Sequence, residues 1–209
     1  MYYVGITGGV GSGKSRVLAW LEEHTDCRVI RSDDLARSMT EKGQPCWQAY
    51  VDLFGSEVLD KNGEVDRRKV SSLVFGNEKL LEKLNQATHP LVSREIARLA
   101  EETDRAGRAF FFLESAVLIE EKYDEICDEL WYVYADENVR RQRLRSERGY
   151  SEERITKMME SQLPEEVYRE KCRFVIDNSG DFSETASQLS RWMEENIHVF
   201  MQPGERKQR

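Results

Sequence analysis

Apolar residues gather in five short runs along the chain, and the segments between them show helical spacing of apolar and polar positions. The five runs are "YYVGIT" (2–7), "CRVIR" (27–31), "AFFFLE" (109–114), "ELWYVYA" (129–135) and "RFVID" (173–177). A short and nearly continuous apolar run is typical of a strand that is buried on both faces, and helices between such strands favour parallel pairing. The pattern therefore predicts an α/β protein with a five-stranded parallel sheet covered by helices.

Helical spacing fills the segments between the runs. It predicts helices over 15–24, 77–88, 91–107, 136–148, 151–163 and 183–200. The long segment between the second and third runs has no convincing strand. Two short helical patterns in it, 47–55 and 66–76, are joined by the turn "DKNG" at 60–63. We expect this segment to be a helical insertion over the carboxyl edge of the sheet.

The first apolar run leads into "GGVGSGKS", residues 8–15, and then into a helical pattern. This stretch fits the phosphate-binding motif G-x-x-x-x-G-K-[ST], in the strand-to-helix context that the motif requires. Glycines let the backbone approach an anion, which the loop N–H groups and the start of the helix attract. Lys14 would reach the outer phosphates, and Ser15 would offer its hydroxyl to Mg²⁺. The alternative is a merely flexible glycine-rich turn.

Carboxylates stand at the ends of two other runs. Asp33 and Asp34 follow the second run, and Glu114 ends the third. The carboxyl ends of parallel strands converge on the ligand crevice of such a sheet. There Asp33 could accept the proton of a hydroxyl that attacks the γ-phosphate, and Glu114 could hold Mg²⁺ directly or through water. The alternatives are a helix cap formed by Ser32 or Asp33 and an ordinary charge at the end of a strand.

Six arginines and no lysine occupy "NVRRQRLRSERGYSEER", residues 138–154. Arg141, Arg145 and Arg148 fall on one helix face. Guanidinium groups suit phosphate oxygens and stack on adenine, so the segment favours a charged lid over ATP. The alternative is a solvated helix face whose partners are Glu147, Glu152 and Glu153. The turn "DNSG" at 177–180 is expected beside the adenine base or is simply a turn.

Composition and charge narrow the class of protein. The chain is 39% hydrophobic, which is enough for a core, and it has no apolar stretch of membrane-spanning length. The first residues do not show the pattern of a signal peptide, so we expect none. We therefore expect a cytoplasmic protein that is a monomer or a small homo-oligomer. The net charge of −8 argues against nucleic acid or an anionic membrane as partner. The cysteines and histidines are too scattered for a zinc site, and no guanine-reading Asn-Lys-x-Asp segment occurs.

Longer blocks of the sequence resemble one family, the dephospho-CoA kinases. The blocks are "GITGGVGSGKS", "SDDLAR", "LFGSEVLDKNGEVDRRKVSSLVF", "LNQATHPLV", "LESAVLIEEKYDEICDELWYVYAD", "ERGYSEERI", "SQL" and "FVIDNSG". The resemblance implies phosphorylation of the ribose 3′-hydroxyl of dephospho-CoA by ATP, the last step of coenzyme A synthesis. It implies ATP and dephospho-CoA as small-molecule substrates, Mg²⁺ as cofactor and a three-layer P-loop fold. The alternative is a P-loop kinase for another nucleoside, nucleotide or small metabolite.

Matching positions assign roles within that resemblance. Asp33 is implied as the general base, Lys14 as the second catalytic residue, and Ser15 with Glu114 as metal ligands. The acceptor side comprises Asp33, His89 and Arg67. The ATP side comprises Gly11, Ser12, Gly13, Lys14, Ser15, Arg16, Arg141, Arg148 and Asn178. The chain departs from the family pattern at Arg31, Glu114, Ala116, Arg140 and Glu147.

The whole chain, 1–209, is expected to be one dephospho-CoA kinase-like domain. Its core would comprise 1–35, 108–136 and 172–198. A helical insertion that binds the CoA part would cover about 36–107, and a helical lid would cover about 137–171. The polar residues 199–209 would form a tail.

Overall fold

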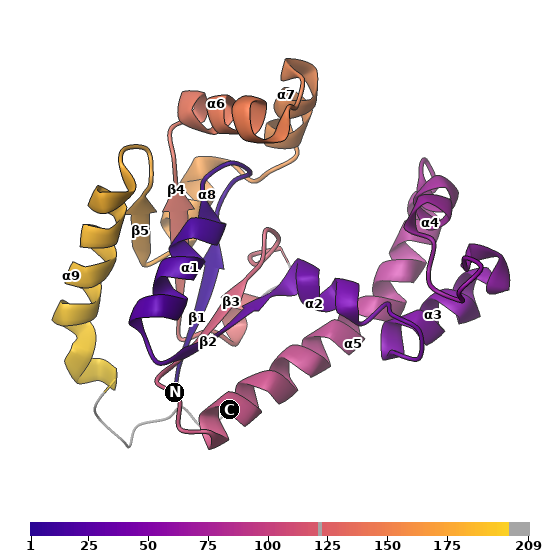
Figure 1. Cartoon of the computed structure of the whole chain (residues 1–209), viewed down its shortest axis with the longest axis horizontal. Helices are drawn as coiled ribbons and strands as arrows, with labels where there is room; N and C mark the ends of the chain where they lie inside the picture. The colour runs from indigo at the N-terminus through magenta and orange to yellow at the C-terminus, as the bar shows by residue number, and fades with distance from the viewer. Residues whose placement is uncertain (121–122, 201–209) are drawn as a thin grey trace. The chain divides into compact units, whose positions relative to one another are not determined.

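The structure is a computed structural model that describes residues 1–120 and 123–200. The chain forms two compact units. One consists of residues 1–29 together with the chain from residue 103 onward, and the other consists of residues 30–102. Figure 1 labels the helices and strands of both. From residue 201 on, the expected tail lies outside the described residues.

Five strands form one sheet in the order β2-β3-β1-β4-β5. The strands are β1 (Tyr2–Thr7), β2 (Cys27–Arg31), β3 (Phe110–Glu114), β4 (Glu129–Tyr134) and β5 (Phe174–Asp177). β1 runs parallel to both β3 and β4, and β4 runs parallel to β5 (Figure 1). The predicted five-stranded parallel sheet is thus confirmed, and each predicted strand matches to within one residue at its ends.

Helices flank this sheet within the first unit. They are α1 (Lys14–His24), α6 (Glu137–Arg148), α7 (Glu152–Glu160), α8 (Glu165–Lys171) and α9 (Phe182–Phe200), with a 3-10 turn η2 (Tyr123–Glu125). Asp136 and Ser151 accept hydrogen bonds from backbone N–H groups at the starts of α6 and α7, which explains where these helices begin. The sequence pattern did not predict α8, because Tyr168 is its one buried side chain.

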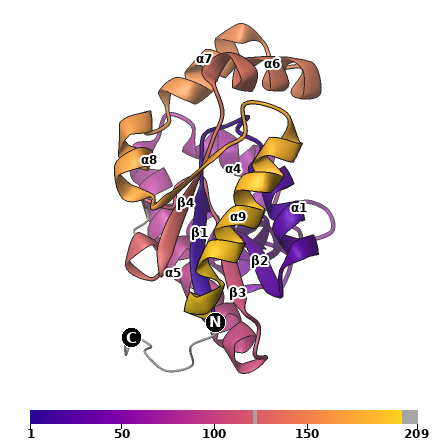
Figure 2. The same cartoon turned by 90° about the vertical axis from the view of Figure 1, so that its left-hand side faces the viewer.

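Side chains that alternate along β4 divide the core between the two faces of the sheet. Trp131 and Val133 are fully buried in a cluster with residues of α1 and α9. The Trp131 ring lies edge-on to Trp192 of α9, with ring centroids 4.5 Å apart. Tyr132 points to the opposite face, where its ring stacks on Tyr168 of α8 at 4.8 Å. Figure 2 shows α9 and α8 flanking the strands. Both faces are therefore covered, which fits the nearly continuous apolar strands.

The second unit is helical. Its elements are α2 (Ser32–Ser38), α3 (Pro45–Phe54), a 3-10 turn η1 (Ser56–Val58), α4 (Arg67–Val74) and most of α5 (Glu78–Arg105). A small core of Phe54, Val58, Val70 and Leu84 holds α3, η1, α4 and α5 together. The predicted short helices and the turn between them are confirmed. The Asp60 carboxylate accepts hydrogen bonds from the backbone N–H groups two and four residues later, which tightens that turn.

Helix α5 corrects one expectation. The sequence predicts two helices, 77–88 and 91–107, yet one helix of 28 residues continues through Pro90. Proline removes a backbone donor and normally ends or kinks a helix at a cost of about 3 kcal/mol. Buried side chains lie on both sides of it, Leu84 before and Val92 and Ile96 after. Their burial offsets the cost. None of the helices in the described part of the chain is long and apolar enough to cross a bilayer.

Candidate active site

The loop between β1 and α1 has the backbone that an anion site requires. Gly8 and Gly13 have φ angles of 151° and 90°, in the region that favours glycine, and a Cβ at Gly13 would collide with the Asn178 amide. Helix α1 begins without a side-chain cap and without an acidic residue in its first turn. The positive end of the helix is therefore left to an external anion.

Two hydroxyl groups lie buried at this loop. Thr7 ends β1 and is 0% exposed, and Ser12 lies in the loop and is 1% exposed. Neither hydroxyl oxygen has a hydrogen-bond partner among the described residues. A buried hydroxyl without a partner costs free energy, so the pair marks a place where a polar ligand would be stabilising.

Lys14 reaches back across the loop. Its Nζ donates to the Gly8 carbonyl at 2.8 Å and lies 3.7 Å from Oε1 of Glu114. The sheet register explains the second contact, because Glu114 at the end of β3 is paired with Ile6 of β1, just before the loop. Both side chains are about one-sixth exposed or less, at 14% and 16%. The predicted cation and the predicted metal-binding carboxylate thus share one half-buried place.

Ser15 and Arg16 follow Lys14 on the first turn of α1, and both are exposed. The Arg16 guanidinium lies over the ring of Phe182, 4.1 Å from its centroid, which ties α1 to the start of α9. Ser15 and Glu114 offer oxygen donors, and Mg²⁺ commonly takes one or two protein oxygens together with substrate phosphates and water. Within the described residues no three acidic, histidine or cysteine side chains gather into a metal cluster. The donors present fit Mg²⁺ bound with a nucleotide.

Asn178 follows β5 and holds the loop from the other side. Its Nδ2 donates to the Ser12 carbonyl at 2.6 Å, and its Oδ1 accepts from Thr185 Oγ1 at 3.0 Å. Asn178 is 2% exposed and Thr185 is 0% exposed. Asn178 and both of its partners, Ser12 and Thr185, are buried, so these hydrogen bonds hold the loop backbone in place.

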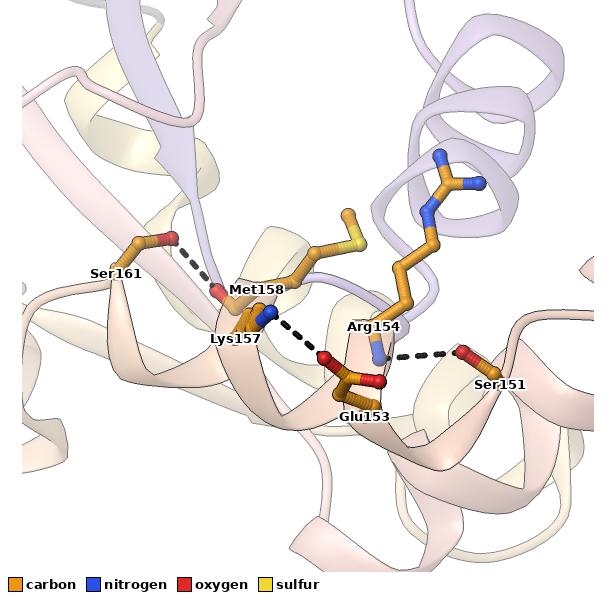
Figure 3. Close-up of a pocket in the computed structure, with 6 residues that line it drawn as sticks. All are labelled: Ser151, Glu153, Arg154, Lys157, Met158 and Ser161. Atoms are coloured by element: carbon orange, nitrogen blue, oxygen red, sulfur yellow. Dashed lines mark hydrogen bonds and ion pairs between the residues drawn. The ribbon is translucent and has the colours of Figure 1, made fainter. Parts of the chain in front are cut away.

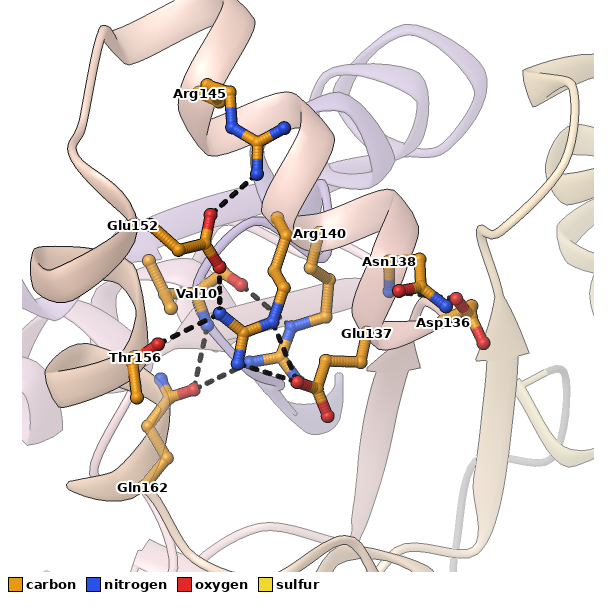
Figure 4. A network of polar contacts seen from close by, with 10 residues as sticks. Val10, Asp136, Glu137, Asn138, Arg140, Arg145, Glu152, Thr156 and Gln162 are labelled. Atoms are coloured by element: carbon orange, nitrogen blue, oxygen red, sulfur yellow. Dashed lines mark hydrogen bonds and ion pairs between the residues drawn. The ribbon is translucent and has the colours of Figure 1, made fainter.

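Two arginines of α6 that we did not assign to the site also contact the loop. Arg143 donates to the carbonyls of Asn178 at 2.8 Å and Ser12 at 3.4 Å. Arg140 Nε donates to the Val10 carbonyl at 2.9 Å (Figure 4). A signal existed in the sequence: α6 begins directly after β4, the strand beside β1, so its first turns come nearest to the loop.

The predicted lid arginines have other contacts. Arg141 is paired with Glu137 and Glu152. Arg145 is paired with Glu152 (Figure 4). The alternative reading expected Glu152 as such a partner. The hydrogen bond from Arg145 is the main cause that lowers the pKa of Glu152. Arg148 is exposed at the end of α6, and its role on the ATP side stays a prediction.

A cavity of about 480 Å³ lies in the second unit. Its lining includes Asp33 from the first turn of α2 and Arg67 from the start of α4. Arg67 Nη2 donates to Thr40 Oγ1 at 3.2 Å, and burial raises the pKa of the Tyr50 phenol in the same wall. The structure therefore brings together two of the three residues predicted for the acceptor. His89 lies on α5 and is not among the residues that line this cavity.

A second cavity, about 410 Å³, lies on α7 (Figure 3). Its charged side chains are engaged locally. Lys157 is paired with Glu153 at 2.8 Å, and the Arg154 guanidinium lies 3.8 Å from the centroid of the Tyr150 ring. Nothing in this geometry directs those groups toward a ligand.

The comparisons with known proteins agree over most of the chain. Residues 2–184 match the family model for dephospho-CoA kinase. A dephospho-CoA kinase from Enterococcus faecalis is 35% identical over 194 residues, which is 93% of this chain and 96% of that protein. One from Carboxydothermus hydrogenoformans is 36% identical over 186 residues, 89% of this chain and 90% of that protein.

Solved structures show the same likeness. A crystal structure of a Thermus thermophilus protein superposes with a TM-score of 0.78 at 30% identity, covering 93% of this chain and 97% of that chain. The dephospho-CoA kinase from Campylobacter jejuni gives 0.64 at 18% identity, with 92% and 96% covered, which is a likeness of fold. With the phosphate loop, the sheet order and the match from residue 2 to residue 184 in agreement, the chain belongs to the dephospho-CoA kinase family.

Proposed function

We propose that this protein transfers the γ-phosphoryl group of ATP to the ribose 3′-hydroxyl of dephospho-CoA, giving coenzyme A and ADP. This reaction is the last step of coenzyme A biosynthesis. The observation that carries the proposal is a complete phosphate loop inside a chain that matches the dephospho-CoA kinase family from residue 2 to residue 184.

The loop supports the ATP side of the proposal. Its N–H groups and the uncapped start of α1 would hold the phosphates, and the buried Ser12 hydroxyl would gain a partner. Lys14 would neutralise charge that develops on the transferred group, with Arg16, Asn178, Arg141 and Arg148 completing the ATP-binding set. Lys14 already lies across the loop, so little rearrangement is required.

The cavity of the second unit supports the acceptor side. Arg67 in its wall would pair with a phosphate of dephospho-CoA, and His89 would contact the same substrate. Asp33 would accept the proton of the 3′-hydroxyl while the bond between that oxygen and the γ-phosphorus forms and the bond to the bridging oxygen of ADP breaks. Asp33 is exposed, as an approaching hydroxyl requires.

Ser15 and Glu114 would hold Mg²⁺ when nucleotide is bound. When bound, the ion would supply positive charge that offsets the charge on the phosphate oxygens. The Glu114 carboxylate is already oriented by the Lys14 ammonium 3.7 Å away.

The helical segments complete the proposal. Residues of about 36–107 would bind the CoA part, and those of about 137–171 would close over ATP to exclude water, because an open site hydrolyses ATP. We propose a cytoplasmic enzyme that is a monomer or a small homo-oligomer.

The test is to incubate the protein with Mg-ATP and dephospho-CoA and to weigh the product. We expect a gain of one phosphoryl group and one ADP per product molecule. Shikimate, gluconate, thymidylate and cytidylate serve as competing acceptors. Phosphorylation of one of these in preference to dephospho-CoA would overturn the substrate assignment, and equal ATP hydrolysis without any acceptor would overturn the kinase assignment.

A further inference from the structure

Side chains from two separate segments hold both backbone groups of Val10 in the phosphate loop. Arg140 Nε donates to the Val10 carbonyl at 2.9 Å, and the Val10 N–H donates to Gln162 Oε1 at 3.1 Å. Arg140 Nη2 also donates to that same Gln162 oxygen, at 2.9 Å. The three residues therefore close a ring of hydrogen bonds around one residue of the loop (Figure 4).

Gly9, the residue before Val10, leaves room for the Arg140 guanidinium because it has no side chain. A Cβ at Gly9 would lie 2.5 Å from the centre of the Arg140 guanidinium. Real Cβ atoms do not approach so closely, so any side chain at Gly9 would displace Arg140 from Val10. The guanidinium thus contacts two consecutive residues of the loop.

The charge of Arg140 is not neutralised by a carboxylate among the described residues. Its hydrogen-bond acceptors are a carbonyl and an amide oxygen, and the described residues offer it no carboxylate at ion-pair distance. Arg141 and Arg145 on the same helix are paired with glutamates. A guanidinium that is not neutralised leaves its positive potential at the loop, where an anionic ligand would be attracted.

We propose that Arg140 and Gln162 are positioning residues that fix the shape of the phosphate loop for the triphosphate of ATP. They act through Val10 and not on the reacting atoms. The inference rests on the proposed function. The ring holds the Val10 backbone in one conformation, so it reduces the ordering that ATP binding must bring about. The loop contacts the phosphates equally in the ground state and in the transition state. A less ordered loop should therefore raise the KM for ATP and leave kcat unchanged.

The experiment uses two variants of the full chain. Arg140→Lys keeps the charge but cannot donate to the Val10 carbonyl and to Gln162 at the same time. Gln162→Met keeps the size of the side chain but removes the oxygen that accepts from Val10 and Arg140. We expect each to raise both the KM for ATP and the calorimetric Kd for ATP without acceptor about tenfold, the effect typical of a lost charge-assisted hydrogen bond. The kcat and the KM for dephospho-CoA should change little. Arg169→Lys, an exposed arginine of α8, is the matched control.

The double variant tests whether the two residues form one unit. Either single change breaks the ring, so the double variant should bind ATP about as weakly as the single variants do. Wild-type ATP affinity in both singles, or losses that multiply in the double, would overturn the proposal. A parallel rise in the KM for dephospho-CoA with a lower Tm would also overturn it, because that result indicates general destabilisation. Failure of the wild type to phosphorylate dephospho-CoA while it binds ATP would overturn the proposed function alone.

Discussion

The Lys14 ammonium lies 3.7 Å from the Glu114 carboxylate at the carboxyl end of the sheet, and it also donates to the Gly8 carbonyl 2.8 Å away. The contact joins the phosphate loop to the end of β3. It places the cation proposed to bind the phosphates beside the carboxylate oxygen proposed to bind the metal.

Removal of the Lys14 charge should disable phosphoryl transfer. Loss of one group that stabilises developing charge typically costs about 10² to 10³ in kcat, so we expect Lys14→Met to lower kcat by at least this factor in a steady-state assay. Lys171→Met, on the exposed face of α8, is the matched control. Wild-type turnover of Lys14→Met would contradict the role of this residue.

Glu114→Gln should act differently from Lys14→Met. The amide keeps the size of the side chain but is a weaker ligand for Mg²⁺. We expect the Mg²⁺ concentration for half-maximal rate to rise, with much of the rate recovered at high Mg²⁺. A rate deficit that does not depend on the Mg²⁺ concentration would exclude Glu114 as a metal ligand.

Asp33→Asn should separate chemistry from binding. Loss of a general base typically costs about 10² to 10⁴ in rate, so kcat should fall by that range while the Kd for ATP stays unchanged. Asp34→Asn is the matched comparison, because Asp34 has the same charge and exposure one residue later in α2. Equal losses of rate in the two variants would show that Asp33 has no special role.

Thr185→Val should weaken the loop from a distance. The change keeps the shape of the side chain but leaves Asn178 Oδ1 buried without its donor, which costs about 1 to 3 kcal/mol in free energy of unfolding. We expect a lower midpoint in urea and a higher KM for ATP. Ser187→Ala, an exposed hydroxyl on the same helix, is the control. An unaltered midpoint would indicate that water replaces the lost donor.

Stability at high pH should depend on Tyr132. Burial is the main cause that raises the pKa of Tyr132 to about 12, from 10.0 for a free tyrosine side chain. The neutral phenol is favoured in the folded state, so its contribution is complete below pH 10 and is lost as the pH rises toward 12. In that window the free energy of unfolding of Tyr132→Phe should fall with pH less steeply than that of the wild type, by up to about 1.4 kcal/mol per pH unit. Urea titrations at pH 9 to 12 measure this slope. Identical slopes for variant and wild type would contradict the assignment.

The sequence predicted what depends on local pattern. The five strands, the phosphate loop and the short helices of the second unit all follow from apolar periodicity, glycine spacing and turn residues. The continuous α5 did not follow, because Pro90 ends a helix by local rules, and the burial of Leu84, Val92 and Ile96 overrides them.

The site residues also divide into those that the sequence predicted and those that depend on the three-dimensional packing. Asp33 and Arg67 were predicted from motif position, and they line one cavity. Arg140 and Arg143 were overlooked because which arginines of α6 reach the loop depends on how the helix is rotated, and i, i+4 spacing cannot reveal that rotation. Their acceptors are backbone carbonyls, which leave no trace in a sequence.

The hydrogen bond from Asn178 to the Ser12 carbonyl joins residues that are 166 positions apart. During synthesis the amino-terminal loop emerges long before the strand that supports it, so a nascent chain carries the binding motif without its native shape. The loop therefore gains this support only after β5 and the residue that follows it have been made, and a chain cut before residue 178 lacks the donor that holds the Ser12 carbonyl.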